Sequence, residues 1–190
     1  MNDILARASQ QKELVADLET YKILLTGTGK ALETQVQKVF EELGFTVQEE
    51  RPSRDDLVLY YNDLDDGVEV KGVAKSAAEK HGAQLEKWVS EYYSEHGTNP
   101  KGILVVNAFN ETPLNARTKK AFPDQMLSYF QNMGHCLITG IQLLGVYLDF
   151  RDDTGKRTER IDRLFGTEGV FDGYHDWSNF LVSREDNTDA

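Results

Sequence analysis

Two predicted strands, at residues 56–61 and 67–71, constrain the fold most, because charged and apolar side chains alternate along the second of them. Successive side chains of a strand point to opposite faces, so Glu69 and Lys71 share one face and two valines share the other. Asp56, at the start of the preceding strand, can reach the charged face. The pattern therefore predicts a strand with its valines on a core and a carboxylate beside an ammonium on its other face.

Periodic apolar residues elsewhere predict helices and further strands. The uninterrupted apolar run at 102–107 is typical of a central strand that is covered on both faces. The order of elements indicates an α/β fold, in which a mixed sheet has helices on both of its faces. The predicted helices span about 3–25, 30–43, 76–95 (capped by Ser76), 123–132 and 141–148, and the predicted strands 45–49, 56–61, 67–71, 102–107 and 136–139.

The chain has 190 residues, the length of one domain with its own core. We expect residues 1–150 to form that domain, with a helix at its N-terminus. The composition changes after Phe150, where a charged, turn-prone segment precedes a modest set of apolar residues. Residues 151–190 are therefore expected to form a small C-terminal appendix packed on the core, with a disordered tail from Ser183.

Charge and hydropathy restrict the classes of partner. The formal net charge of -11 argues against a protein that grips nucleic acid over its whole surface, but it is compatible with a local basic groove or a metal-bridged phosphate. No apolar run approaches membrane-spanning length, no signal peptide is visible, and the single Cys136 cannot form an internal disulfide. We expect a cytoplasmic protein with no membrane partner.

An ordered set of motifs between residues 18 and 148 resembles the PD-(D/E)xK superfamily, the restriction-endonuclease-like phosphodiesterases. The resemblance implies a restriction-endonuclease-like sheet core and a metal-dependent nuclease that hydrolyses phosphodiester bonds with a metal-activated water. DNA is the expected substrate ahead of RNA. The motifs that carry the resemblance are GKALE at 29–33, LGFTV at 43–47, DLVL at 56–59, VEVKG at 68–72, QLEKWV at 84–89, KGILVVN at 101–107, PLNAR at 113–117 and LIT at 137–139.

The resemblance also implies a role for each charged residue of these motifs. Asp56 and Glu69 would bind Mg²⁺ or Mn²⁺, hard cations that prefer carboxylate oxygens, and the backbone carbonyl of Val70 would complete the shell. Lys71 would sit near the attacking water or steady the charge that develops on the phosphate. Glu33 would bind a second metal or orient a water, although an acid near the start of a helix is also favoured by the helix dipole.

Substrate-side roles are implied for five further residues, each with a structural alternative. Gln84 and Trp88 would touch the metal shell or the substrate. The alternative for Gln84 is a solvated helix residue, and a tryptophan at such a position is more often a core anchor. Asn107 and Arg117 would line the cleft, or instead cap a strand end and pair with an acid. Lys75 would belong to a basic rim, although scattered lysines are usually solvated. The lysines considered for this rim are Lys75, Lys80, Lys87 and Lys101.

The sequence departs from the family pattern before Asp56, where Arg54 and Asp55 stand in place of the proline that names the motif. Asp55 is a rival for the ligand role, but Asp56 leads directly into the apolar run that follows. The alternative function is a catalytically inactive, nuclease-like scaffold that binds a protein partner or nucleic acid. In either case a second protomer or a protein partner is the expected source of specificity, because no separate DNA-reading module is present in the sequence.

Overall fold

The computed structural model describes residues 5, 7, 12, 15, 16, 19–49, 56–61 and 64–180, with side chains for all of these except 49, 56, 64–66 and 152. The predicted strands are all present. The predicted N-terminal helix lies largely outside the described residues, as does the predicted tail from Ser183. The strands are β1 (Thr46–Glu49), β2 (Asp56–Tyr61), β3 (Leu64–Val73), β4 (Lys101–Ala108), β5 (Cys136–Thr139) and β6 (Gly169–Val170); the helices are α2 (Ile23–Thr26), α3 (Gly29–Leu43), α4 (Glu79–His96), α5 (Asp124–Asn132), α6 (Gly140–Asp152) and α7 (Arg157–Gly166).

The strands form one mixed sheet in the order β1-β2-β3-β4-β5-β6. The first three strands pair antiparallel, and β3 to β6 pair parallel. Because parallel strands end at the same edge of a sheet, the carboxyl ends of β3, β4 and β5 lie together. Ligands of open α/β sheets commonly bind at this edge, so the topology directs attention to the residues that end β3.

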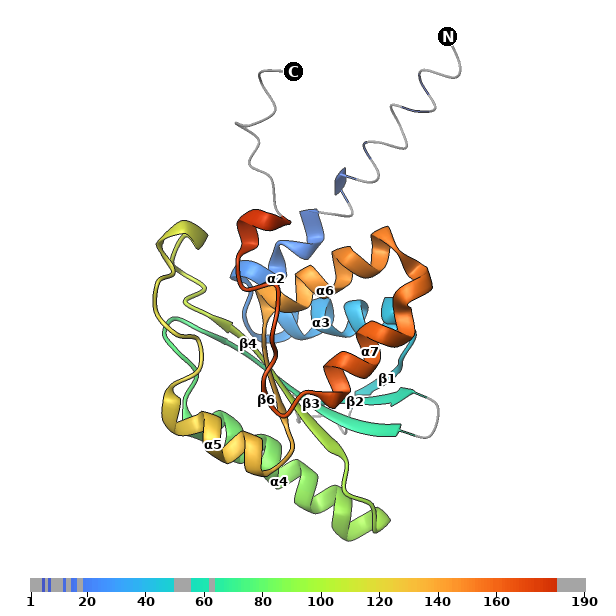
Figure 1. Cartoon of the computed structure of the whole chain (residues 1–190), viewed down its shortest axis with the longest axis vertical. Coiled ribbons are helices and arrows are strands. Elements are labelled where there is room, and N and C mark those ends of the chain that lie inside the picture. The colour runs from blue at the N-terminus through green and yellow to red at the C-terminus, as the bar shows by residue number, and fades with distance from the viewer. Residues whose placement is uncertain are drawn as a thin grey trace.

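Helices cover both faces of the sheet, as the sequence predicts. Helices α4 and α5 lie on one face, and α2, α3, α6 and α7 lie on the other (Figure 1). Alternate residues of β3 point to opposite faces of the sheet, so they pack against different helix layers. Val68 and Val70 belong to the larger core with α3 and α6, whereas Gly67 faces α4, where a Cβ would lie 2.0 Å from the ring of Trp88.

The start of α4 differs from the prediction. The helix begins at Glu79 with Ala78 as its N-cap residue, because Nδ1 of His81 accepts the backbone N–H of Ala78 at 3.1 Å. Ser76 is therefore not the cap; its hydroxyl donates to the carbonyl of Lys120 at 2.8 Å. The side-chain acceptor comes from the third helical residue instead of from the residue before the helix.

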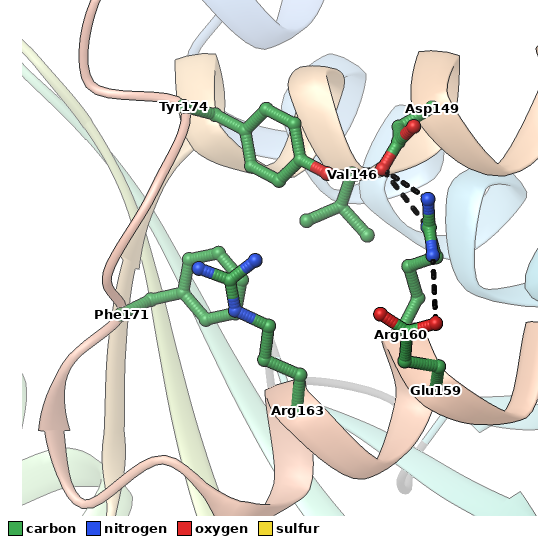
Figure 2. Close-up of a pocket in the computed structure, with 7 residues that line it drawn as sticks. All are labelled: Val146, Asp149, Glu159, Arg160, Arg163, Phe171 and Tyr174. Carbon is green, nitrogen blue, oxygen red and sulfur yellow. Dashed lines mark hydrogen bonds and ion pairs between the residues drawn. The ribbon is translucent and has the colours of Figure 1, made fainter. Parts of the chain in front are cut away.

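The segment from α7 to Tyr174 is joined to α6, which itself continues through Phe150 to Asp152. Arg160 of α7 is buried and places Nη2 2.6 Å from Oδ2 of Asp149, and the hydroxyl of Tyr174 donates to the same carboxylate. The guanidinium of Arg163 donates to the carbonyl of Asp172 and lies 5.3 Å from the centroid of the Phe171 ring. Figure 2 shows these side chains around a cavity of about 60 Å³. Its two arginines already have partners, so we assign the cavity a structural role.

Within the part of the chain that the structure describes, no helix combines the length and the apolar character needed to cross a bilayer.

Candidate active site at the carboxyl end of strand β3

Strand β3 places Glu69 and Lys71 side by side on the face that α4 covers. Their shared face is confirmed, because Nζ of Lys71 lies 2.6 Å from Oε1 of Glu69 and both flanking valines are in the opposite core. The Glu69 side chain is 0% exposed, whereas that of Lys71 is 19% exposed. The sequence does not predict this difference. The ammonium is thus the part of the pair that reaches solvent, and it covers one oxygen of the carboxylate.

The backbone register sets position 56 opposite Glu69. Asp56 is the Cα partner of Glu69, and the described pairing of β2 with β3 ends there, while β3 continues along β4 as far as Val73. Paired positions of an antiparallel ladder belong to one face of the sheet. The structure therefore brings two carboxylate-bearing positions of the predicted metal site next to each other. The rival Asp55 lies outside the described residues.

The donor set at these positions suits a hard cation. Two carboxylates and a backbone carbonyl are the oxygen ligands that Mg²⁺ and Mn²⁺ prefer. Among the side chains that the structure describes, which exclude that of Asp56, no group of three or more His, Cys, Asp or Glu residues is arranged to hold a metal ion. The fit of a metal therefore depends on the chemistry of Asp56, Glu69 and the Val70 carbonyl together with their register.

Glu33 lies on the helix that meets the end of β3. A Cβ at Gly72 would lie 2.6 Å from the carbonyl oxygen of Gly27, so the turn before α3 packs directly on the strand one residue beyond Lys71. Glu33 is buried, and its Oε2 lies 3.8 Å from Nζ of Lys30. Because α3 begins at Gly29, Glu33 lies after the first turn of the helix. The helix dipole therefore does not explain an acid at this position.

Asn107 and Arg117 hold α2 and the turn that follows it in place. The buried Asn107 donates from Nδ2 to the Gly27 carbonyl at 2.9 Å. Arg117 donates from Nη2 to the Leu25 carbonyl at 2.7 Å and from Nε to the Thr112 carbonyl at 2.8 Å, and burial lowers the pKa of its guanidinium. These contacts give both residues a structural role, but their partners are backbone carbonyls and not the strand end and the acid of the structural alternative. They position α3 against β3 and β4, and with it Glu33.

Gln84 and Trp88 share one side of α4 but differ in exposure. Trp88 is 2% exposed and packs against Gly67, Val58 and Tyr92, with its ring centroid 5.2 Å from that of Tyr92. Trp88 is thus a core anchor that joins α4 to the strand of the site. Gln84 is exposed, so it is the member of this pair that is open to a ligand.

His81 is a residue of the site that the sequence did not reveal. It is buried in the first turn of α4, and burial, together with the positive charges of Lys80 and Lys71, lowers the pKa of its imidazole. Since Nδ1 accepts the N–H of Ala78, the neutral ring carries its proton on Nε2. The charge of Lys71 thus acts on the neutral His81 ring. The sequence signal for it is weak, a histidine at the third position of a helix.

Lys75 is exposed two residues after the end of β3, which is compatible with the predicted rim. Lys101 is not part of that rim, because it opens β4 at the other edge of the sheet, where Nζ donates to the carbonyls of Gly134 and Thr167 at 2.8 and 2.6 Å.

Comparisons of the chain with protein-family models, with curated proteins and with solved structures found no match in any of the three.

Proposed function

We propose that this chain is a metal-dependent nuclease with a restriction-endonuclease-like fold of the PD-(D/E)xK type. Its substrate would be the phosphodiester backbone of nucleic acid, DNA ahead of RNA. The observation that carries the proposal is the Glu69–Lys71 pair on β3, opposite position 56, at the end of the described pairing of β2 with β3. The element order supports it, because Glu33 is on the helix before the sheet and Gln84 is on the helix after β3.

Asp56, Glu69 and the carbonyl of Val70 are the groups that would hold Mg²⁺ or Mn²⁺. When bound, the metal would supply a more acidic water and positive charge beside the phosphate. Lys71 has a second role in this arrangement. Nζ of Lys71 lies 2.6 Å from Oε1 of Glu69, so Lys71 would leave that carboxylate if a cation occupied it and would then contact the substrate phosphate. The Nε2–H of neutral His81 is a nearby donor for a phosphate oxygen.

The first prediction concerns cleavage. We expect Glu69→Gln and Lys71→Ala each to lower Mg²⁺-dependent cleavage of labelled DNA roughly 100-fold or more, because each removes a charge that acts on the reacting phosphate. Wild type and variants are incubated with single- and double-stranded DNA and RNA in Mg²⁺, Mn²⁺ or EDTA, and products are resolved on gels. The matched control is Lys156→Ala, an exposed lysine in the turn before α7 that pairs with Asp153.

Circular dichroism and thermal unfolding of each variant separate a loss of chemistry from a loss of fold. If Lys71→Ala cut a substrate as fast as wild type and as fast as the Lys156→Ala control, the proposed mechanism would be wrong.

A second candidate is favoured by the burial of Glu69. A carboxylate that is 0% exposed beneath its own lysine suits a structural ion pair, and hence a nuclease-like scaffold that binds a protein partner or nucleic acid without cutting. The same assay discriminates the two functions, because a scaffold retains nucleic-acid or protein binding and shows no cleavage with either metal. A second protomer or a protein partner is the proposed source of sequence specificity for both.

A further inference from the structure

Two loops that leave the carboxyl ends of β3 and β4 are joined into one surface. We call residues 73–78 and 109–121 the basic loop pair. Phe109 opens the second loop with a φ of 53°, a left-handed conformation that a bulky residue adopts only where its surroundings hold it. Four hydrogen bonds join the loops: Ala77 N–H to Ala121 O at 2.8 Å, Phe109 N–H to Lys75 O at 3.3 Å, Asn110 N–H to Val73 O at 3.2 Å, and Ser76 O–H to Lys120 O at 2.8 Å.

The basic loop pair carries a positive surface on an acidic protein. Lys75, Lys119 and Lys120 are exposed, and Arg117 adds a fourth cation, against Glu111 as the one acid in these two segments. Lys120 also pairs with Asp124 at 2.6 Å, but both side chains are more than 70% exposed, and such surface pairs hold a lysine only weakly. The chain as a whole has a net charge of -11, so the basic loop pair is a local positive surface on a negatively charged protein.

The positive surface lies next to the candidate active site. The register pairs Gly72 with Asn107 and Val73 with Ala108, so both loops start at the strand ends immediately beyond Lys71. A groove of about 190 Å³ runs beside the second loop, and Asn107, Arg117, Lys119, Thr139, Gln142 and His175 are among its lining residues. A polyanion that reached Lys71 along this edge of the sheet would therefore pass the exposed lysines.

We propose that the basic loop pair binds the phosphodiester backbone of nucleic acid and guides it to the Glu69–Lys71 pair. The choice of nucleic acid as the polyanion rests on the proposed function, and the charge complementarity stands on the exposed lysines. Lys75, Lys119 and Lys120 contact phosphates, so they set affinity and its salt dependence without reading sequence. Binding confined to this surface also explains how a protein of this net charge approaches a polyanion.

The test measures binding without cleavage. The affinity of the full chain for fluorescently labelled duplex and single-stranded DNA is measured by anisotropy in EDTA, at several NaCl concentrations. The variant is Lys75→Gln/Lys119→Gln/Lys120→Gln. The matched control, Lys22→Gln/Lys38→Gln/Lys156→Gln, removes the same charge from partly or largely exposed lysines at the start of α2, in α3 and in the turn before α7. Thermal unfolding verifies that both variants fold.

We expect the loop variant to bind at least roughly tenfold more weakly, with the slope of log affinity against log salt reduced by about 0.9 for each lost duplex contact. The control triple should keep the wild-type slope. Equal effects of the two triple variants, or no binding by wild type, would overturn the proposal. Binding that depends on the loop lysines, without cleavage in Mg²⁺, would support this inference and reject the nuclease activity. Cleavage that is unchanged in the loop variant would support the nuclease activity and reject this inference.

Discussion

At the scale of single residues, His135 shows how burial makes stability depend on pH. Its Nδ1 accepts the N–H of Gly102 at 3.0 Å and its Nε2 lies 2.8 Å from Glu86, while burial, partly assisted by Lys101, lowers its pKa to about 4. The unfolded chain, with a histidine pKa near 6.5, takes up this proton first as the pH falls. The folded state should therefore lose up to about 3 kcal/mol between pH 6.5 and 4 from this histidine. Glu86 changes the stability in the opposite direction. Burial raises its pKa, so the folded chain takes up this proton before the unfolded chain does and is stabilised as the pH falls.

His135→Asn tests this account, because the amide oxygen can still accept the Gly102 N–H but does not titrate. Urea unfolding between pH 7.5 and 4.5 should give a flatter dependence of the unfolding free energy on pH than in wild type. His96→Asn, at the exposed end of α4, is the matched control for the replacement of a histidine by asparagine. An unchanged pH dependence in His135→Asn would assign the acid sensitivity to other groups.

At the scale of elements, the strand of the site is tied to α4 by close approach. Trp88 fills the place of a side chain at Gly67, so Gly67→Ala must move the indole and should cost about 1–3 kcal/mol of unfolding free energy. In a Trp88→Leu background the same change should cost less, since the smaller side chain leaves room, and urea unfolding of the four proteins measures the coupling. Gly166→Ala is the control, because a Cβ there meets nothing within 4 Å. Equal costs of Gly67→Ala in both backgrounds would contradict the contact.

Elements are also the scale at which the sequence was most and least informative. The period of two along 67–71 correctly placed Glu69 and Lys71 on one face, because side-chain alternation is a local property of a strand. The burial of Glu69 depends on α4 packing over it, which local periodicity does not encode. Likewise β6 has two residues, too few for a period, and the Asp149–Arg160 pair joins helices through a contact that spacing alone does not predict.

The candidate site also has residues that the sequence predicts and residues that it does not. The order of charged residues along the chain led to Asp56, Glu69 and Lys71, and the register confirms that positions 56 and 69 are neighbours. His81 and the basic loop pair depend instead on a helix start and on hydrogen bonds between two loops, each of which brings together residues that no local pattern relates. Asn107 and Arg117 carry polar groups at suggestive positions, but their partners are backbone carbonyls of α2, of the turn after it and of Thr112.

At the scale of the whole molecule, the question is whether residues beyond 150 are an appendix or part of one cooperative unit. Phe171 is fully buried in the same core cluster as Val70, and the buried Gln142 of α6 donates from Nε2 to the carbonyls of Phe171 and Gly173 at 2.7 and 3.0 Å. We therefore expect Phe171→Ala to destabilise the entire chain by about 3–5 kcal/mol. The effect should reach the Glu69–Lys71 strand, because one core supports both.

The two tryptophans can report whether the domain unfolds as one unit, because they lie in different parts of the fold. Trp88 is in α4, and Trp177 is in the segment after β6. In a Trp177→Phe protein and in a Trp88→Phe protein, urea unfolding followed by fluorescence should coincide with unfolding followed by far-UV circular dichroism, with and without Phe171→Ala. A Trp177 transition that came at lower urea than the loss of helix signal would show an appendix that detaches first. Coincident transitions would instead make residues 151–180 a structural part of the domain that holds the candidate site.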